Sequence, residues 1–293
     1  MIENCKKYGL FLFTLLLLGV TSFLFYQDFQ SFHRGLTFAM LDVGQGDSLF
    51  IESPTGTQIL VDGGPPRKIL SALSRIMSPF DRTIDGIIIT NPDQDHIGGF
   101  EEVLKVYEVD RIFEPGTYND SKTYQNLETE IDNKIKNKKI QKILVKKGMR
   151  LDIGGGAVID ILFPDRDVSF WDSNDGSVIA KLAYGETSVM LMGDATAETE
   201  KIILNEFSKT TLESTILKVG HHGSRTSTSA LFVEAVAPNY ALISNGRDNN
   251  YGHPHRDTLD ILASFGTKIF RTDLLGNIVV KSDGTKEVFS FQK

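Results

Sequence analysis

Three potential metal ligands lie within four residues at Asp93-Gln94-Asp95-His96. The apolar run Ile84–Thr90 before them predicts a buried strand, and Pro92 prevents that strand from continuing. Carboxylates and an imidazole carried by one loop after a strand can converge on a single cation without long-range rearrangement. The alternative is a polar turn in which Asp95 caps the next helix and His96 is incidental.

Polar residues border apolar segments at three further places. Gly193-Asp194 presents a carboxylate at the end of one run, and Gly220-His221-His222-Gly223 presents two imidazoles at the end of another. Gly252-His253-Pro254-His255 lies before a predicted helix. Five of the six histidines therefore fall in glycine-flanked loops, and only His33 lies apart. Chance rarely produces this pattern, so it predicts a metal centre assembled from loops at strand ends.

The elements that must position these loops are strands first, and then strands alternating with helices. Strands are predicted at Leu36–Val43, Ser48–Glu52, Gln58–Val61, Ile84–Thr90, Val158–Phe163, Ser177–Tyr184, Ser188–Met192, Ile216–Val219, Tyr240–Ser244, Lys268–Arg271, Ile278–Val280 and Glu287–Phe291. Helices are predicted at Lys68–Met77, Phe100–Tyr107, Tyr124–Lys138, Ala197–Phe207, Thr228–Val236 and Arg256–Ser264. Such an order suggests two packed sheets with helices on the outside. No Pro/Ser-rich linker interrupts residues 36–293, so these residues are predicted to form one hydrolase domain.

Together with further segments, these loops resemble the metallo-β-lactamase fold, and most of all the hydrolase domain of ComEC-type competence (DNA-internalisation) proteins. The further segments are Leu41-Asp42-Val43-Gly44-Gln45-Gly46-Asp47, Leu60-Val61-Asp62-Gly63-Gly64, Asn174-Asp175-Gly176-Ser177 and Asn249-Asn250-Tyr251-Gly252-His253-Pro254. The resemblance covers about residues 36–290. It implies an α/β (α+β) fold, a four-layer αββα sandwich with a metal site at the mouth between its two sheets.

The resemblance implies ligand roles at the matching positions. Asp93, Asp95 and His96 match the first ligand motif of the family, and Asp194 matches the carboxylate that bridges two cations. The pair His221-His222 supplies a late ligand. His222 is preferred, although the sequence alone does not separate the two histidines.

Other matching positions are expected to support the ligands or the substrate. Asp62 is expected to orient a metal-binding side chain through a hydrogen bond to an atom of that side chain that does not bind the metal. His253 is expected to bind metal or to contact the scissile group. Lys218 faces phosphate, with a solvent-exposed lysine as the equal alternative. Asn174 or Asp175 matches the loop where lactamase relatives place another histidine.

Two positions depart from the lactamase pattern. Asn91 stands where the family has histidine, and Asp93 stands where lactamases have their second histidine. The competence proteins share only the second difference. An amide oxygen is a poorer zinc ligand than imidazole, so this Asp-rich site favours Mn²⁺ or Mg²⁺ over the alternative, Zn²⁺. The resemblance therefore implies one or two divalent cations, with Asn91 as a weak ligand and a single-metal or inactive site as alternatives.

A site of this kind supports attack of metal-activated water on an electrophile. Asp95 or Asp93 can take the proton when it is not fully engaged as a ligand. β-Lactams are disfavoured because the His-x-His ligand pair is absent, whereas anionic phosphodiesters suit an Asp-rich centre. The resemblance implies a nuclease that acts on DNA during uptake. The alternatives are hydrolysis of an envelope phosphoester, such as a phosphocholine- or teichoic-type polymer, and a degenerate, non-catalytic binding module.

The charge balance gives limited support for a nucleic-acid substrate. The formal net charge of −7 excludes binding by bulk attraction, so a local basic patch is required. The stretch Lys134–Arg150 contains seven lysines and one arginine. A solvated helix face and hairpin is the slightly favoured interpretation of that stretch. The single cysteine, Cys5, excludes an intramolecular disulfide and a cysteine-rich metal site.

Residues 1–35 predict a membrane anchor and a short linker. No charge occurs from Tyr8 to Tyr26, and a helix over this spanning segment, residues 8–26, is about 28 Å long, close to the hydrocarbon thickness of a bilayer. Lys6 and Lys7 place the N-terminus in the cytoplasm and the hydrolase domain outside, in a single-pass arrangement at the cell membrane. A cleaved signal peptide is the alternative. Full competence proteins also carry a many-helix channel domain, which a single spanning segment does not form. The chain is therefore expected either to act alone on the outer face or to accompany a separate channel subunit.

Overall fold

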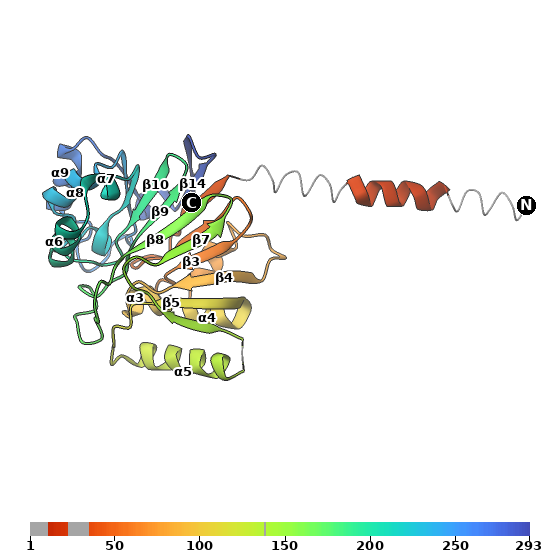
Figure 1. Cartoon of the computed structure of the whole chain (residues 1–293), viewed down its shortest axis with the longest axis horizontal. Helices are drawn as coiled ribbons and strands as arrows, with labels where there is room; N and C mark the ends of the chain where they lie inside the picture. Colours follow the sequence, from red (N-terminus) through yellow and green to blue (C-terminus); the bar gives the residue numbers. More distant parts are fainter. Residues whose placement is uncertain (1–10, 23–34, 138) are drawn as a thin grey trace, which may run out of the picture.

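Two β-sheets lie face to face in the computed structural model of the chain, which describes residues 11–22, 35–137 and 139–293 (Figure 1). Sheet A contains, in spatial order, β15 (Glu287–Gln292), β14 (Asn277–Ser282), β1 (Leu36–Met40), β2 (Leu49–Glu52), β3 (Gln58–Val61), β4 (Thr83–Ile88), β5 (Glu108–Glu114) and β6 (Gln141–Leu144). Sheet B contains β13 (Lys268–Arg271), β12 (Tyr240–Ile243), β11 (Ile216–Lys218), β10 (Thr187–Leu191), β9 (Ile179–Tyr184), β8 (Ala157–Phe163) and β7 (Arg150–Gly154).

Helices cover the outer face of each sheet. On sheet A these are α2 (Ile69–Leu73), α4 (Phe100–Val106) and α5 (Lys122–Lys136). On sheet B they are α6 (Ala197–Glu206), α7 (Lys209–Leu212), α8 (Ala230–Val236) and α9 (Arg256–Ser264). The short elements α3 (Gln94–Ile97), η1 (Gly220–Gly223) and α10 (Thr272–Leu275) lie in connections. One apolar core lies between sheet A and its helices, and a second lies between sheet B and its helices. A third apolar core fills the space between the two sheets. These four layers confirm the predicted αββα sandwich.

Strand β1 shows how its sequence places it between two layers. Leu36, Phe38 and Met40 belong to the core between the sheets, and Ala39 belongs to the core beneath the helices. Successive residues of a strand point to opposite faces of a sheet, so apolar residues at both sets of positions bury both faces. Each fully buried large side chain of this kind contributes roughly 1.5–3 kcal/mol.

Parallel strands bring the predicted site loops to one rim of the sandwich. Strands β3, β4 and β5 are parallel in sheet A, and β10 to β13 are parallel in sheet B. Asp62 follows β3, and residues 93–96 follow β4. Asp194 follows β10, and residues 221–222 follow β11. Each of these loops therefore lies at the carboxyl end of a parallel strand.

The basic stretch Lys134–Arg150 is divided between the end of α5, strand β6 and the start of β7. Four of its basic side chains form ion pairs with acidic neighbours. These pairs are Lys134–Glu130, Lys142–Glu128, Lys147–Glu206 and Arg150–Asp160. The pairing neutralises much of the positive charge and agrees with a solvated helix face. The expected hairpin is wrong, because β6 pairs with β5 in sheet A and β7 pairs with β8 in sheet B.

The N-terminal prediction is only partly within the described residues. Residues 11–22 form a helix with exposed side chains, among them Phe11, Leu16 and Leu18. Over the described part of the chain, no helix combines the length and apolar character needed to cross a bilayer. The predicted spanning segment 8–26 extends beyond the described residues at both ends, so the anchor stays a prediction.

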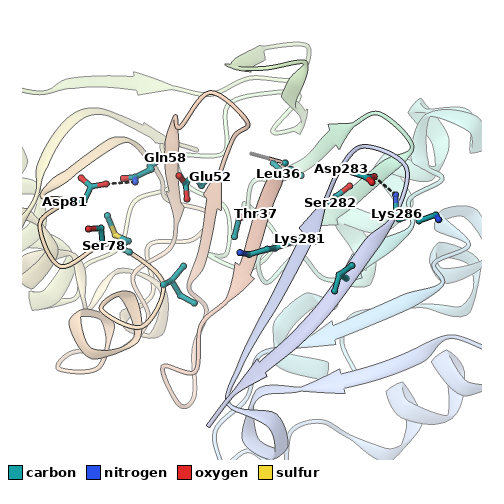
Figure 2. Close-up of a pocket in the computed structure, with 14 residues that line it drawn as sticks. Leu36, Thr37, Glu52, Gln58, Ser78, Asp81, Lys281, Ser282, Asp283 and Lys286 are labelled. Carbon is teal, nitrogen blue, oxygen red and sulfur yellow. Dashed lines mark hydrogen bonds between the residues drawn. The ribbon is translucent and has the colours of Figure 1, made fainter. Parts of the chain in front are cut away.

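A cavity of about 750 Å³ lies on sheet A at the end away from the rim (Figure 2). Its lining includes four residues that pair with one another across neighbouring strands of sheet A. They are Lys281, Thr37, Glu52 and Gln58. Strands β1 and β3 begin near these residues and run toward the rim, so a strand's length separates the cavity from the loops. None of the candidate site residues lines it.

Candidate metal centre

Side chains from three loops converge at the rim between the sheets. Nε2 of His96 lies 3.1 Å from Oδ2 of Asp194. Nε2 of His222 lies 3.2 Å from Oδ2 of Asp95 and 3.5 Å from Oδ2 of Asp194. One ligand atom from each of the four residues lies within 4.8 Å of the others. Asp95, His96, Asp194 and His222 form what we call the ligand cluster.

The backbone turns sharply where each loop leaves its strand. Asp95 and His96 lie on the four-residue helix α3, and Asp194 follows Gly193, which has a φ of 50°. His221 and His222 have φ values of 47° and 53°. This left-handed conformation costs residues other than glycine about 1–3 kcal/mol each. The surrounding packing must offset that cost, and it thereby directs the His222 ring into the cluster.

The ligand cluster leaves buried polar atoms without hydrogen bonds within the described residues. These atoms are Nε2 of His96, Nε2 of His222 and Oδ1 of Asp194. The short nitrogen–oxygen separations in the cluster are ion-pair distances and do not have hydrogen-bond geometry. An unsatisfied buried polar atom costs about 1–3 kcal/mol, and native proteins rarely tolerate one. Imidazole nitrogens and carboxylate oxygens that face one another can share a divalent cation, so these residues fit a metal ion.

Asp62 holds the His96 ring from behind. Its Oδ2 lies 2.9 Å from Nδ1 of His96, which leaves Nε2 directed toward Asp194. The backbone NH of Thr90 donates to Oδ1 of Asp62 at 2.8 Å, and the Thr90 hydroxyl donates to Oδ2. A carboxylate in this position fixes the tautomer of an imidazole and makes the opposite nitrogen a better ligand.

Lys218 lies beneath the ligand cluster and is fully buried. Its ammonium pairs with Asp47, donates to the Gly193 carbonyl at 2.8 Å and lies 4.0 Å from Oδ1 of Asp194. The alternative of a solvent-exposed lysine is therefore wrong, and the buried ammonium is not available to a substrate phosphate. Lys218 instead neutralises one carboxylate and faces a second.

Asp47 completes this arrangement and is absent from the residues proposed from sequence, although it closes the segment Leu41–Asp47. Its Oδ1 lies 3.4 Å from Nδ1 of His222, and that nitrogen donates to the Ser244 carbonyl at 3.0 Å. Burial alone would raise the pKa of Asp47, but Lys218 and His222 outweigh burial and lower it. A carboxylate placed directly before a buried strand is the signal that could have identified it.

Asn91 ties neighbouring loops together through its amide. Its Oδ1 accepts from the backbone NH of Asp93 at 2.8 Å, and its Nδ2 donates to Oδ1 of Asn174 at 3.0 Å and to Oγ of Ser177 at 3.3 Å. Asn119 donates to Oδ1 of Asp93 at 2.8 Å. Asn91, Asp93 and Asn174 therefore lie beside the ligand cluster, with their side chains engaged in joining loops.

His221 and His253 lie at the edge of the ligand cluster. Nε2 of His221 is 3.9 Å from Oδ2 of Asp194, and the ring centroids of His221 and His253 are 5.6 Å apart. Nδ1 of His253 is buried and makes no hydrogen bond within the described residues. Asp175 points elsewhere, because it accepts a hydrogen bond from the hydroxyl of Thr196 at the start of α6.

Carboxylates and imidazoles in the ligand cluster shift one another's pKa. Burial alone would lower the pKa of His96 and of His222. Asp194 and the carboxylate behind each ring outweigh burial, so both pKa values are raised well above the usual range. Burial would raise the pKa of Asp194, but the two rings hold it well below its ordinary value. Without a cation, the rings of His96 and His222 therefore keep their second, charge-bearing proton to a higher pH than an ordinary histidine does.

Two groups beside the cluster titrate differently. Burial raises the pKa of Asp93. Burial, followed by the neighbouring His222 and His221, lowers the pKa of His253 to about 4. Near neutral pH, His253 is therefore uncharged, and Asp93 is a stronger base than an ordinary aspartate.

Comparisons with known proteins agree with this geometry. The family model described as the metallo-beta-lactamase superfamily matches residues 41–247. The chain is 31% identical over 269 residues to ComE operon protein 3 of Bacillus subtilis (strain 168), a match that covers 86% of this chain and 34% of that protein. It is 27% identical over 241 residues to Competence protein ComA of Neisseria gonorrhoeae, a match that covers 80% of this chain and 30% of that protein. The chain spans about a third of the length of these curated relatives.

Two solved structures share the fold at low sequence identity. A mutant of CmlA beta-hydroxylase has a TM-score of 0.51 and 14% identity, with 84% of this chain and 54% of that chain covered. A long form RNase Z from yeast has a TM-score of 0.51 and 12% identity, with 85% of this chain and 42% of that chain covered. These likenesses concern the fold alone.

Proposed function

The chain belongs to the metallo-beta-lactamase superfamily, and we propose that it is a metal-dependent phosphodiesterase that cleaves DNA. The chain is a metallo-beta-lactamase-fold hydrolase related to competence proteins. The observation that carries the proposal is the ligand cluster, in which two carboxylates and two imidazoles face one another. Three of the buried atoms in the cluster make no hydrogen bond within the described residues.

Asp95, His96, Asp194 and His222 are the residues that would hold a cation. A bound divalent cation supplies a Lewis acid and lowers the pKa of the water that it binds. Carboxylates make up half of the cluster and Asp93 lies beside it, so Mn²⁺ or Mg²⁺ is proposed in preference to Zn²⁺. A second cation would draw on the residues at the edge, His221, His253 and Asp93.

Residues around the cluster have chemistry suited to hydrolysis. The raised pKa of Asp93 brings its carboxylate closer to the working pH, where a general base is most effective. His253 is uncharged near neutral pH and is proposed to donate a hydrogen bond to a phosphoryl oxygen or to a leaving group. Asn91 is proposed as a residue that positions Asp93, because its oxygen already accepts from the Asp93 backbone.

DNA uptake is the proposed setting of this activity. The similarity to the competence protein of Neisseria gonorrhoeae supports a link to DNA. About two thirds of each relative lies outside the match. A channel subunit is a further proposed partner.

The hydrolase is further proposed to sit on the outer side of a cell membrane, held by residues 8–26. The exposed apolar side chains of residues 11–22 and the basic pair Lys6 and Lys7 support this arrangement. Cys5 is the single cysteine, so a membrane-impermeant maleimide should label it only after the cells are permeabilised. A Cys5→Ser chain carrying Phe80→Cys, at a site 93% exposed, should be labelled in intact cells. Labelling of Cys5 in intact cells would contradict the orientation.

Cleavage assays test the catalytic proposal. The full chain should shorten linear DNA with Mn²⁺ and stop when a chelator is added. Asp194→Asn and His222→Gln should abolish cleavage, because each removes a ligand with little change of volume. Asp260→Asn, in an exposed ion pair on α9, is the matched control and should retain activity.

The same preparation separates the alternatives. Cleavage of a teichoic- or phosphocholine-type polymer with no cleavage of DNA would move the proposal to an envelope phosphoester hydrolase. Bound metal with no cleavage of either substrate would instead leave a non-catalytic module as the better account.

A further inference from the structure

Three exposed aromatic residues lie on segments that are linked to the loops of the ligand cluster, and the proposed chemistry leaves them without a role. Phe170 is 96% exposed, Tyr251 is 66% exposed and Tyr118 is 58% exposed. An exposed aromatic residue indicates little by itself, because a protein surface contains many apolar atoms. What distinguishes these three is how hydrogen bonds and ring contacts connect them to the site.

Tyr118 and Phe170 lie on the side of Asp93. The backbone NH of Tyr118 donates to the carbonyl of Ser169 at 3.0 Å, which joins the segment before α5 to the loop between β8 and β9. That loop, which carries Phe170, projects from the domain in green (Figure 1). Asn119, next to Tyr118, donates to Oδ1 of Asp93 at 2.8 Å. The backbone segments that carry Tyr118 and Phe170 are therefore linked to the loop that carries candidate ligands.

Tyr251 lies on the side of His253. The two rings are stacked, with centroids 5.6 Å apart and planes inclined by 24°. The ring of His253 in turn lies 6.4 Å from the ring of His222 in the ligand cluster. Asn249 holds this loop in place, because its Oδ1 accepts from the backbone NH groups of Tyr251 at 3.2 Å and His253 at 3.0 Å. One face of Tyr251 thus packs toward the site while most of the ring stays exposed.

Charge alone is a weak source of affinity for nucleic acid on this chain. The net charge is −7, and four side chains of the basic stretch are already paired with acids. Stacking of a base on an aromatic ring does not depend on net charge, and it tolerates any base sequence. It does require an unpaired base, because bases in a duplex are already stacked on one another.

We infer that Tyr118, Phe170 and Tyr251 stack on unpaired bases on the two sides of the scissile phosphodiester, and that the substrate is single-stranded DNA. The inference rests on the proposed function, since it takes the ligand cluster as the place of cleavage. The exposed side chain of Arg225 lies on the Tyr251 side, where its backbone NH donates to Nδ1 of His255 at 3.1 Å. It supplies a cation for the phosphates there.

Binding of two probes to the metal-free full chain tests the inference. One probe is a fluorescein-labelled oligothymidylate of about twelve nucleotides, within the span of typical single-strand sites. The other is an abasic strand of equal length and charge, so the difference between the probes reports contacts with bases. The oligothymidylate should bind at least about 100-fold more tightly than the abasic strand, as two or more stacked bases would give.

Single variants then locate the base contacts. Phe170→Ala and Tyr251→Ala should each weaken binding of the oligothymidylate about tenfold and leave binding of the abasic strand unchanged. Phe80→Ala is the matched control, because it removes an equally exposed ring between two residues that line the cavity at the other end of sheet A. It should change neither affinity.

Several results would overturn the inference. Equal affinity for the two probes would do so, as would equal affinity for a duplex, or unchanged binding by both alanine variants. Cleavage with Mn²⁺ is read separately. If the chain cleaves DNA but binds the probes equally, stacking fails and the proposed function stands. If the probes differ but no metal-dependent cleavage occurs, the proposed function fails and base stacking stands.

Discussion

Replacing Lys218 by methionine removes the ammonium beneath the ligand cluster and keeps most of the side-chain volume. Asp47, which is 1% exposed, would lose its ion-pair partner, and neither of its carboxylate oxygens has a hydrogen bond within the described residues. The carbonyl of Gly193 would also lose its donor. Breaking a buried ion pair from one side costs about 3–5 kcal/mol. We therefore expect Lys218→Met to lower the free energy of unfolding by about 3–5 kcal/mol in the metal-free chain.

A double variant separates the ion pair from other effects of the methionine. The double variant Asp47→Asn/Lys218→Met also removes the carboxylate that paired with Lys218, so it should be more stable than Lys218→Met by about 1–3 kcal/mol. Urea unfolding, followed through the fluorescence of Trp171 in mild detergent with chelator, gives both values. Lys201→Met, in an exposed pair with Glu198, is the control and should change little. A double variant no more stable than Lys218→Met would refute the reasoning.

Three further predictions concern the metal centre. Asp62→Asn should weaken Mn²⁺ binding about 10- to 100-fold, measured by calorimetry, because His96 loses the carboxylate that orients it; unchanged affinity would contradict this. The raised pKa values of His96 and His222 mean that protons on these rings stabilise the metal-free chain fully below about pH 6.5 and that this stability is lost as the pH rises through the raised values. Metal must displace those protons, so the affinity for Mn²⁺ should fall as the pH falls. The released protons should make the heat of Mn²⁺ binding, measured by calorimetry, depend on the buffer. An affinity that does not change with pH would contradict this prediction. Asn91→His should lower the melting temperature without tighter Mn²⁺ binding, because it breaks the amide contacts with Asp93 and Asn174; a gain in affinity would restore Asn91 as a degenerate ligand position.

Local sequence was sufficient to predict the layers and the loops that meet at the rim. Apolar alternation in Leu36–Val43 and the apolar-rich run at Ile84–Thr90 both mark real strands, although these strands end at Met40 and Ile88. Glycine beside Asp194 and the histidine pair marks sharp turns after strands. Because parallel strands end at a common rim, residues distant in sequence could be expected to meet there.

Local sequence patterns could not predict contacts between segments that are distant in the chain. Strand β5 mixes charged and apolar residues, and β7 is an edge strand in which only Ile153 is buried, so neither has the apolar signal of a central strand. The burial of Lys218 depends on Asp47, which reaches it from the other sheet. A lysine looks exposed in sequence until the carboxylate that compensates its charge is placed beside it.

Titration of the chelator-treated full chain with Mn²⁺ tests the central claim most directly, because the claim is that the ligand cluster holds a catalytic cation. We predict one or two bound equivalents in the wild-type chain and loss of the tighter one in Asp194→Asn and in His222→Gln. Asp260→Asn should bind as the wild type does. Failure to bind Mn²⁺, Mg²⁺ or Zn²⁺, or equal binding by Asp194→Asn and the wild type, would contradict the account.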